Sequence, residues 1–205
     1  AAVPAMAAND HYTRGFLHPV GAGGYPAHAA AAWGWDQHEV VDGDLEVIAA
    51  PIDFLGVNYY TRQVVRSPHL DTLPAAPGPE LTGMGWEVYP EGLTETLEFV
   101  ASRTGELPLF VTENGAAYPD DPEDPGRDPE RVAYLRRHLV AALAAIDRGV
   151  PLQGYFAWSL LDNFEWGYGY GQRFGIVHVD FATQQRTVRD SARYLAQVAR
   201  SGSPV

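Results

Sequence analysis

The sequence lacks cysteine altogether, and it has few basic residues. Without cysteine there can be no disulfide bond, no thiolate nucleophile and no cysteine-ligated zinc or iron-sulfur site. The 14 basic residues against 26 acidic ones give a formal net charge of -12. Such a surface repels the phosphate backbone of nucleic acids and anionic bilayers, so we expect no nucleic-acid partner and no membrane association. Because the absence of cysteine suits a reducing compartment, we expect a cytoplasmic location.

Long hydrophobic runs are missing as well. No run approaches the roughly 18 apolar residues that a membrane-spanning helix needs. Residues 1–30 contain no basic stretch followed by an apolar one, which is the pattern of a secretion signal. Hydrophobic residues still make up 46% of the 205-residue chain, which is enough for one sizeable core. The length therefore favours a single domain.

What the sequence does contain is an alternation of strand and helix patterns, which favours an α/β fold with a parallel sheet. Three nearly continuous apolar runs, at 52–60, 107–112 and 152–159, are typical of parallel strands covered on both faces. A complete (β/α)8 barrel needs eight strand and helix units in about 250 residues. Three units therefore predict part of a barrel.

Three helices are predicted between and after these strands. The first spans 90–105, opened by a proline and closed by a glycine, and the second spans 128–149, with an aspartate cap followed by a proline. The last covers about 190–199, after a hairpin-like stretch at 174–186. The apolar positions at helical spacing are Leu93, Leu97 and Val100 in the first helix, and Val132, Leu135, Leu139, Leu143 and Ile146 in the second.

Residues 1–50 are rich in alanine and in helix-breaking residues. We predict the end of a helix, then an irregular loop at 19–26, and then a short helix at about 44–50. No internal repeat is visible beyond the alternation of strand and helix. Residues 1–205 are therefore assigned to one domain, as part of a single barrel.

Polar and aromatic side chains collect where the predicted strands end. In a barrel of parallel strands these ends share one face, and that face is where catalytic groups gather. The candidates in chain order are Asn58, Tyr60, Glu113, Asn114, Trp158, Asp162, Asn163, Glu165 and Trp166.

Four segments resemble, in the same order, the motifs of glycoside hydrolase family 1, the β-glucosidase family. They are residues 53–60 (DFLGVNYY), 83–87 (GMGWE), 111–115 (VTENG) and 158–166 (WSLLDNFEW), the last followed by 173–175 (RFG). One of these segments alone is a weak signal, whereas four in order are specific. The resemblance covers about residues 40–198. It implies the C-terminal portion of a (β/α)8 barrel whose N-terminal strands are absent from this chain.

For function, the resemblance implies a retaining β-glycosidase that hydrolyses terminal, non-phosphorylated β-D-glucosides by double displacement. Glu113 matches the nucleophile, and Tyr60 and Asn58 match residues that orient this carboxylate and bind the sugar 2-hydroxyl. The positions matching sugar-binding residues are Trp86, Trp158, Glu165, Trp166 and Phe174. Glu165 matches a residue beside the sugar 6-position, where its charge would repel a phosphate. A neutral β-glucoside or short β-linked oligosaccharide is therefore the expected substrate.

The resemblance also requires a second carboxylate, the general acid/base, in a Thr-x-Asn-Glu-Pro type segment roughly 5 Å from the nucleophile. Asn-Glu-Pro does not occur in this sequence. We expect the acid/base to come from the N-terminal half of the same barrel, as a separate chain or a missing segment. No metal and no organic cofactor is implied. The alternative is a non-catalytic, carbohydrate-binding remnant of the same barrel.

Simpler explanations exist for several of these residues. The aromatic rings also fit ordinary core packing. The acidic run at 120–130 lacks the spacing of an EF-hand calcium loop and is predicted to be a solvated loop. The glycine-rich segment 167–171 lacks the lysine of a phosphate-binding loop and is predicted to be flexible. The seven histidines lack the paired spacing of a zinc site, so no metal site is expected.

Overall fold

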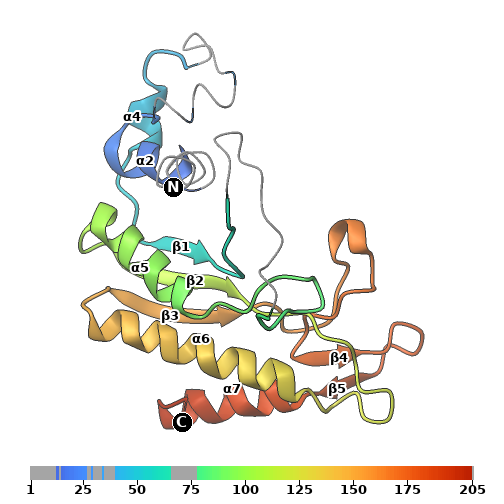
Figure 1. Ribbon diagram of the computed structural model, residues 1–205. Helices are drawn as coiled ribbons and strands as arrows, with labels where there is room; N and C mark the ends of the chain where they lie inside the picture. The colour runs from blue at the N-terminus through green and yellow to red at the C-terminus, as the bar shows by residue number, and fades with distance from the viewer. Residues whose placement is uncertain are drawn as a thin grey trace. The chain divides into compact units, whose positions relative to one another are not determined.

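The structure, a computed structural model (Figure 1), describes residues 15–26, 40–65 and 78–204, together with positions 13, 29 and 34. The chain divides into two compact units. The first consists of Ala1–Asp53, Gln63–Pro77 and Phe99–Leu107, and the second of Phe54–Arg62, Gly78–Glu98 and Pro108–Val205. All of the predicted site residues belong to the second unit.

The first unit contains two short helices, α2 (Gly15–Ala22) and α4 (Asp44–Ile48), which contact each other. Helix α4 confirms the short helix predicted at about 44–50. The loop predicted at 19–26 is wrong in its first half, because α2 continues through Pro19. The helix ends before Gly23, whose φ of 69° is left-handed. The helix end predicted further upstream lies mostly outside the described residues.

The second unit is built on a sheet of three parallel strands in the order β1 (Leu55–Asn58), β2 (Leu109–Asn114) and β3 (Leu152–Ala157). The α/β class and the parallel sheet are therefore confirmed. β1 and β3 lie within the predicted segments, and β2 extends two residues beyond its predicted end. Asn58 is the register partner of Glu113, so the ends of β1 and β2 are aligned.

The two faces of this sheet differ in burial. Val57 and Val111 on one face are 7% and 0% exposed, and helices α5 and α6 run alongside the strands in Figure 1. On the other face Phe54 and Phe156 are 55% and 58% exposed, and Phe54 contacts Phe110 with ring centroids 5.3 Å apart. The strands were predicted to be covered on both faces. The described part of the chain covers only one of them.

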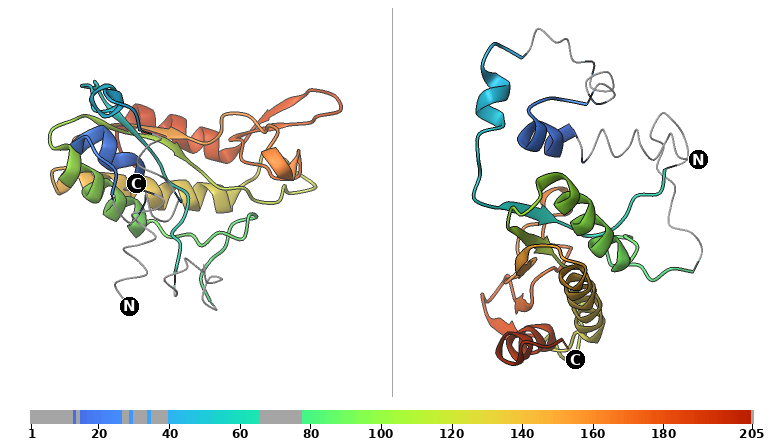
Figure 2. Two further views of the ribbon diagram at one scale, coloured as in Figure 1. Left: turned by 90° about the horizontal axis from the view of Figure 1, so that it is seen from above. Right: turned by 90° about the vertical axis from the view of Figure 1, so that its left-hand side faces the viewer.

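Three longer helices confirm the predicted ones: α5 (Glu91–Thr104), α6 (Pro129–Asp147) and α7 (Asp190–Ser201). Gly105 and Gly149 follow the first two with left-handed φ angles of 63° and 91°. Helix α6 contacts β3 and α7, and α7 runs beside α6 (Figure 2). The predicted inner face of α5 is confirmed, because its two leucines are fully buried and its valine is 4% exposed.

Helix α6 buries only part of the predicted stripe, in which Leu135 is 1% exposed as expected. Leu143 and Ile146 of the predicted stripe are 41% and 43% exposed. The buried residues of this helix are Arg131, Tyr134, Leu135, His138, Ala141, Ala142 and Ala145. Small residues allow a close approach between helices, and the hydroxyl of Thr94 in α5 donates to the carbonyl of Ala141 at 2.8 Å. Ala141 of α6 therefore faces α5 at this contact.

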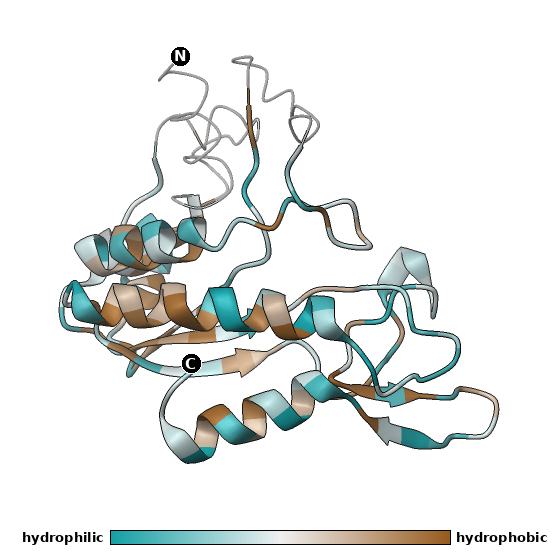
Figure 3. Cartoon of the chain, turned by 60° about the horizontal axis from the view of Figure 1, so that its bottom comes forward, coloured by the Kyte–Doolittle hydropathy of each residue, from teal (hydrophilic) through white to brown (hydrophobic). Residues whose placement is uncertain are grey.

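After the sheet, β4 (Val177–Val179) and β5 (Arg186–Val188) form an antiparallel pair, which confirms the hairpin-like stretch. Helix α7 is amphipathic, as the alternating colours along it show (Figure 3). Its Tyr194 and Leu195 pack against a buried cluster that includes Tyr134 of α6. Within the described residues, no helix has the length and apolar composition needed to cross a membrane.

Candidate active site

The ends of the three strands are joined side by side by backbone contacts. Asn58 and Glu113 are register partners, and the amide of Trp158, just after β3, donates to the carbonyl of Asn114 at 2.9 Å. A Cβ atom on Gly115 would overlap the carbonyl oxygen of Trp158, so a glycine is needed for this close approach. The structure thus brings together the predicted site residues of all three strand ends.

Tyr60 and Glu113 form the central polar contact. The Tyr60 hydroxyl donates to Oε2 of Glu113 at 2.7 Å, and both residues are half-buried. Burial, and then the hydrogen bond to Glu113, raise the pKa of Tyr60 above its ordinary value. The phenol therefore stays protonated over any working pH and holds one carboxylate oxygen in place.

Asn58 is exposed, and its side chain is oriented by β2. Oδ1 of Asn58 accepts a hydrogen bond from the hydroxyl of Thr112 at 2.7 Å. Among the described residues no hydrogen bond joins Asn58 to Glu113. The amide nitrogen of Asn58 and the second lone pair of its oxygen can both bind a ligand hydroxyl.

Three aromatic rings pack beside the central carboxylate. The Tyr60 ring lies 5.5 Å from that of Trp86 and 6.2 Å from that of Phe174, and the last two rings are also 6.2 Å apart. Trp86 is half-buried, whereas Phe174 is only 2% exposed. Phe174 therefore supports the other two rings, and its predicted role as a sugar-lining residue stays a prediction.

Glu165 places a second carboxylate in the electrostatic environment of Glu113. Its pKa is raised, first by burial and also by the charge of Glu113, while a hydrogen bond from Trp158 lowers it. Trp166 next to it is 79% exposed and has a φ of 44°. The flexible loop predicted at 167–171 begins with a short 3-10 helix, Trp166–Tyr168. This segment therefore offers a ligand the carboxylate of Glu165 as a hydrogen-bond acceptor and the exposed indole ring of Trp166.

A buried group lies behind the central contact, and of its members only Asn114 was among the predicted candidates. Asn114 is fully buried, and its amide donates to the carbonyl of Tyr59 at 2.7 Å and to the hydroxyl of Tyr134 at 3.2 Å. The Tyr134 hydroxyl in turn donates to the carbonyl of Tyr60 at 3.1 Å, and Tyr155 donates to Oδ1 of Asn114. These contacts fix the backbone that carries the central pair. Tyr134 belongs to α6, and no local motif marked it.

The acidic run was predicted to be a solvated loop, and this is wrong for two of its members. Asp120 is half-buried and pairs with Arg189, whose side chain is 1% exposed. Asp128 is 6% exposed and receives hydrogen bonds from Arg131 at 2.6 Å and from the backbone amide of Ser191 at 2.9 Å. Because its carboxylate is engaged there, Asp128 makes no side-chain cap bond to α6. Buried arginines, which composition does not reveal, account for the difference.

This arrangement of carboxylates and aromatic rings is suited to binding a polyhydroxylated ligand and to attacking it. An oriented carboxylate can attack an electrophilic carbon, and a second carboxylate can accept from two adjacent hydroxyl groups. The exposed indole ring of Trp166 offers a face on which an apolar ring surface can stack.

Comparisons with known proteins agree with this geometry. The family model described as glycosyl hydrolase family 1 matches residues 2–203. A bifunctional β-D-glucosidase/β-D-fucosidase from Bifidobacterium breve is 41% identical over 87% of this chain and 44% of its own length. β-Glucosidase A from Thermotoga maritima is 41% identical over 91% of this chain and 43% of its own length.

Solved structures give the same result. The crystal structure of the AHE enzyme from Alicyclobacillus herbarius matches with a TM-score of 0.91 and 44% identity, covering 100% of this chain and 47% of that one. A family 1 β-glucosidase from Thermotoga maritima in complex with isofagomine lactam matches with a TM-score of 0.88 and 36% identity, covering 97% of this chain and 46% of the other. This chain thus spans less than half the length of the relatives that it matches.

Proposed function

Because the chain belongs to glycosyl hydrolase family 1 and has the fold of the C-terminal portion of its (β/α)8 barrel, we propose that it carries the nucleophile of a retaining β-glycosidase. The observation that carries the proposal is the hydrogen bond from Tyr60 to Glu113, which orients a carboxylate at the end of β2. A carboxylate held by a neutral donor at a strand end suits nucleophilic attack.

The proposed reaction has two displacements at the anomeric carbon. In the first, an oxygen of Glu113 forms a bond to the anomeric carbon while the bond to the leaving oxygen breaks, and the acid/base carboxyl gives its proton to that oxygen. In the second, the acid/base carboxylate takes a proton from water, the water oxygen bonds to the anomeric carbon, and Glu113 is released. Two inversions give a product with the same anomeric configuration as the substrate.

The proposed substrate is a terminal, non-phosphorylated β-D-glucoside. Glu165 accepts from outer hydroxyls of the sugar, with Trp158 and Trp166 beside them, and Trp86 stacks on the aglycone or second sugar. The two curated relatives are named for β-glucosidase activity, and one of them also for β-fucosidase activity, which involves neutral sugars as well. The carboxylate of Glu165 supports the same choice, because its negative charge would repel a phosphate.

We propose that the acid/base glutamate and the remaining strands come from an N-terminal half, in a longer chain or a separate one. The relatives are more than twice as long as the segment they share with this chain. In the second unit β1 and β3 are the sheet edges, and the phenylalanines on one face are largely exposed. Open edges and exposed apolar faces are unfavourable, and completing the barrel would cover both. A cytoplasmic location stays a prediction.

The experiment uses the protein with its N-terminal half and follows hydrolysis of a β-glucoside by proton NMR. We expect the β-anomer of glucose to form first, and we expect Glu113→Gln to lower kcat by about 10⁴-fold or more. Azide should restore turnover in Glu113→Gly by forming the α-glycosyl azide. Glu123→Gln, an exposed glutamate in the loop after the same strand, is the matched control and should leave kcat unchanged. Release of the α-anomer first, or full activity of the Glu113 variants, would contradict the proposal.

A further inference from the structure

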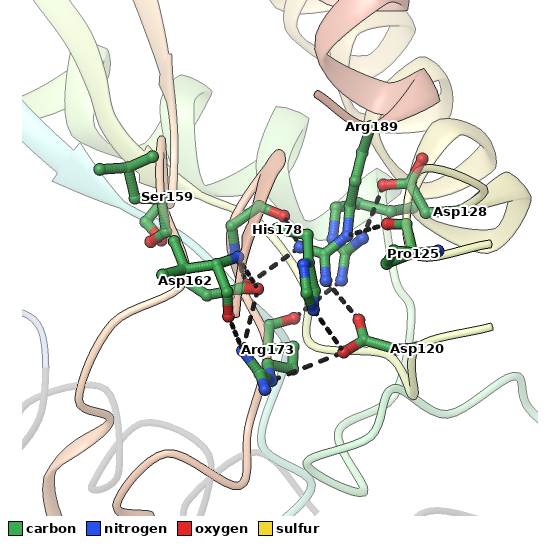
Figure 4. A network of polar contacts seen from close by, with 12 residues as sticks. Asp120, Pro125, Asp128, Ser159, Asp162, Arg173, His178 and Arg189 are labelled. Carbon is green, nitrogen blue, oxygen red and sulfur yellow. Dashed lines mark hydrogen bonds and ion pairs between the residues drawn. The ribbon is translucent and has the colours of Figure 1, made fainter. Parts of the chain in front are cut away.

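A buried network of charged side chains lies beside the segment that follows β3 (Figure 4). Its centre is the ion pair between Asp162 and Arg189, whose side chains are 0% and 1% exposed and 2.9 Å apart. Arg173, Asp120 and His178 surround this pair in Figure 4. Burying so much charge is expensive, so each charge needs several partners.

Asp162 has four such partners. Oδ1 accepts from the backbone amide of Gly175 at 2.9 Å and from Arg189 at 2.9 Å. Oδ2 accepts from the amide of Val179 at 3.2 Å and from Arg173 at 3.3 Å. This one carboxylate therefore joins its own segment to the start of the hairpin and to α7.

Arg189, just before α7, reaches further. Its guanidinium also donates to Asp120 and to the carbonyl of Pro125, both in the loop after β2, and to the carbonyl of Gly175. A Cβ on Gly175 would overlap the backbone of Asp162, so these segments are in direct contact. The planar fork of arginine can serve all of these acceptors at once, whereas the single ammonium group of a lysine cannot.

This network connects two segments that carry or adjoin residues of the candidate site. Asp162 lies between Trp158 and Glu165 in the chain, and Asp120 lies on the loop that follows Glu113. We infer that the Asp162–Arg189 pair is a positioning device, which sets Glu165 and Trp166 relative to Glu113 by fixing the two loops to each other. This inference rests on the proposed function, since it concerns how the same site selects its sugar.

A metal site is the other explanation for the cluster, because single ligand atoms of Asp120, Asp162 and His178 lie within 4.8 Å of one another. Both aspartates are already paired with Arg189, and Arg173 also lies within 4.0 Å of each of them. A cation would have to enter beside two guanidinium groups, which repel it. The contacts therefore favour the positioning role.

The test compares two substrates of the complete enzyme, a β-D-glucoside and the matching β-D-xyloside, which lacks the hydroxymethyl group at C5. Arg189→Lys keeps the charge but loses the fork. We expect kcat/KM for the glucoside to fall by about 10² and the preference for glucoside over xyloside to fall by at least about 10-fold. Arg173→Lys, at a side chain that is 21% exposed, is a milder variant in case the first does not fold, and it should shift the preference in the same direction.

Arg193→Lys is the matched control, because Arg193 lies on α7 in an exposed ion pair with Asp190. This variant should leave kcat/KM unchanged for both substrates. An equal loss for both substrates, or an unchanged preference in a folded variant, would overturn the positioning role while leaving the proposed function intact. Failure of the unaltered enzyme to hydrolyse either substrate would overturn the proposed function, and the inference with it.

Discussion

At the residue scale, the contact between Tyr60 and Glu113 joins two positions that lie 53 residues apart in the chain. The hydroxyl cannot act as an acid at ordinary pH, because burial and the neighbouring carboxylate both raise the pKa of Tyr60. Its effect on the reaction is therefore to orient Glu113 and to donate a hydrogen bond to it.

Removing this hydroxyl should slow the reaction without unfolding the protein. A hydrogen bond to a charged group contributes about 1.5–3 kcal/mol, so we expect Tyr60→Phe to lower kcat by about 10- to 100-fold. Steady-state kinetics of the complete enzyme measure this. Tyr194→Phe removes a phenol hydroxyl on α7 that donates to the carbonyl of Pro204, beyond the end of the helix, and it should leave kcat unchanged. Equal kcat values for Tyr60→Phe and the unaltered enzyme would show that the hydrogen bond has no part in the reaction.

Sequence motifs identified the residues at the strand ends but not those that hold them. Glu113, Tyr60 and Trp86 lie in short local patterns, and the structure brings all three together. Tyr134 of α6 donates to the carbonyl of Tyr60, and Arg189, just before α7, donates to Asp162. Such long-range contacts leave no local pattern, and a buried arginine looks like a surface residue in the sequence.

At the element scale, the sequence of α6 predicts the ends of the helix better than it predicts which residues are buried. The helix and both of its ends were predicted, because a proline after an aspartate and a closing glycine are strong local signals. Its inner face was predicted only in part, since Leu135 is buried but Leu143 and Ile146 are exposed, because two stripes with the same period run along this helix. Large aliphatic residues form one of them, and alanines, Tyr134 and His138 form the other. Periodicity alone cannot tell which residues of the two stripes are buried.

His138 on this buried face predicts a pH dependence of stability. Burial lowers the pKa of His138 to about 4, its Nδ1 contacts the carbonyl of Tyr134 at 2.8 Å, and its Nε2 has no partner among the described residues. On acidification the unfolded chain takes up this proton first, since the pKa of a free histidine is about 6.5. The stabilising contribution of His138 to the folded state is therefore fully present above about pH 6.5, and it is lost as the pH falls towards 4.

We expect this single group to lower the free energy of unfolding by about 2 kcal/mol between about pH 7 and pH 5. Denaturant unfolding of the complete protein at the two pH values measures the loss. In His138→Leu the loss should be smaller by that amount, because the group that takes up the proton is gone. An identical loss in both proteins would rule out His138 as its cause.

At the scale of the whole molecule, two predictions from the sequence agree with the comparisons. The α/β class and the assignment to part of a (β/α)8 barrel follow from the strand and helix order, and matches at TM-scores of 0.91 and 0.88 support both. The strand patterns alone do not reveal the exposed sheet face, because an apolar strand has the same sequence pattern whether or not its second cover is present. That cover is what we propose the N-terminal half provides.

The central claim is that Glu113 attacks the sugar, and covalent labelling tests it most directly. An activated 2-deoxy-2-fluoro-β-glucoside has a leaving group that departs without a proton, so the reaction needs the nucleophile but not the acid/base glutamate. The complete enzyme would be treated with this compound, digested and analysed by mass spectrometry. The account predicts one sugar per active site, attached to Glu113, and none in Glu113→Gln. A sugar on any other residue, or no adduct on an enzyme that hydrolyses β-glucosides, would contradict it.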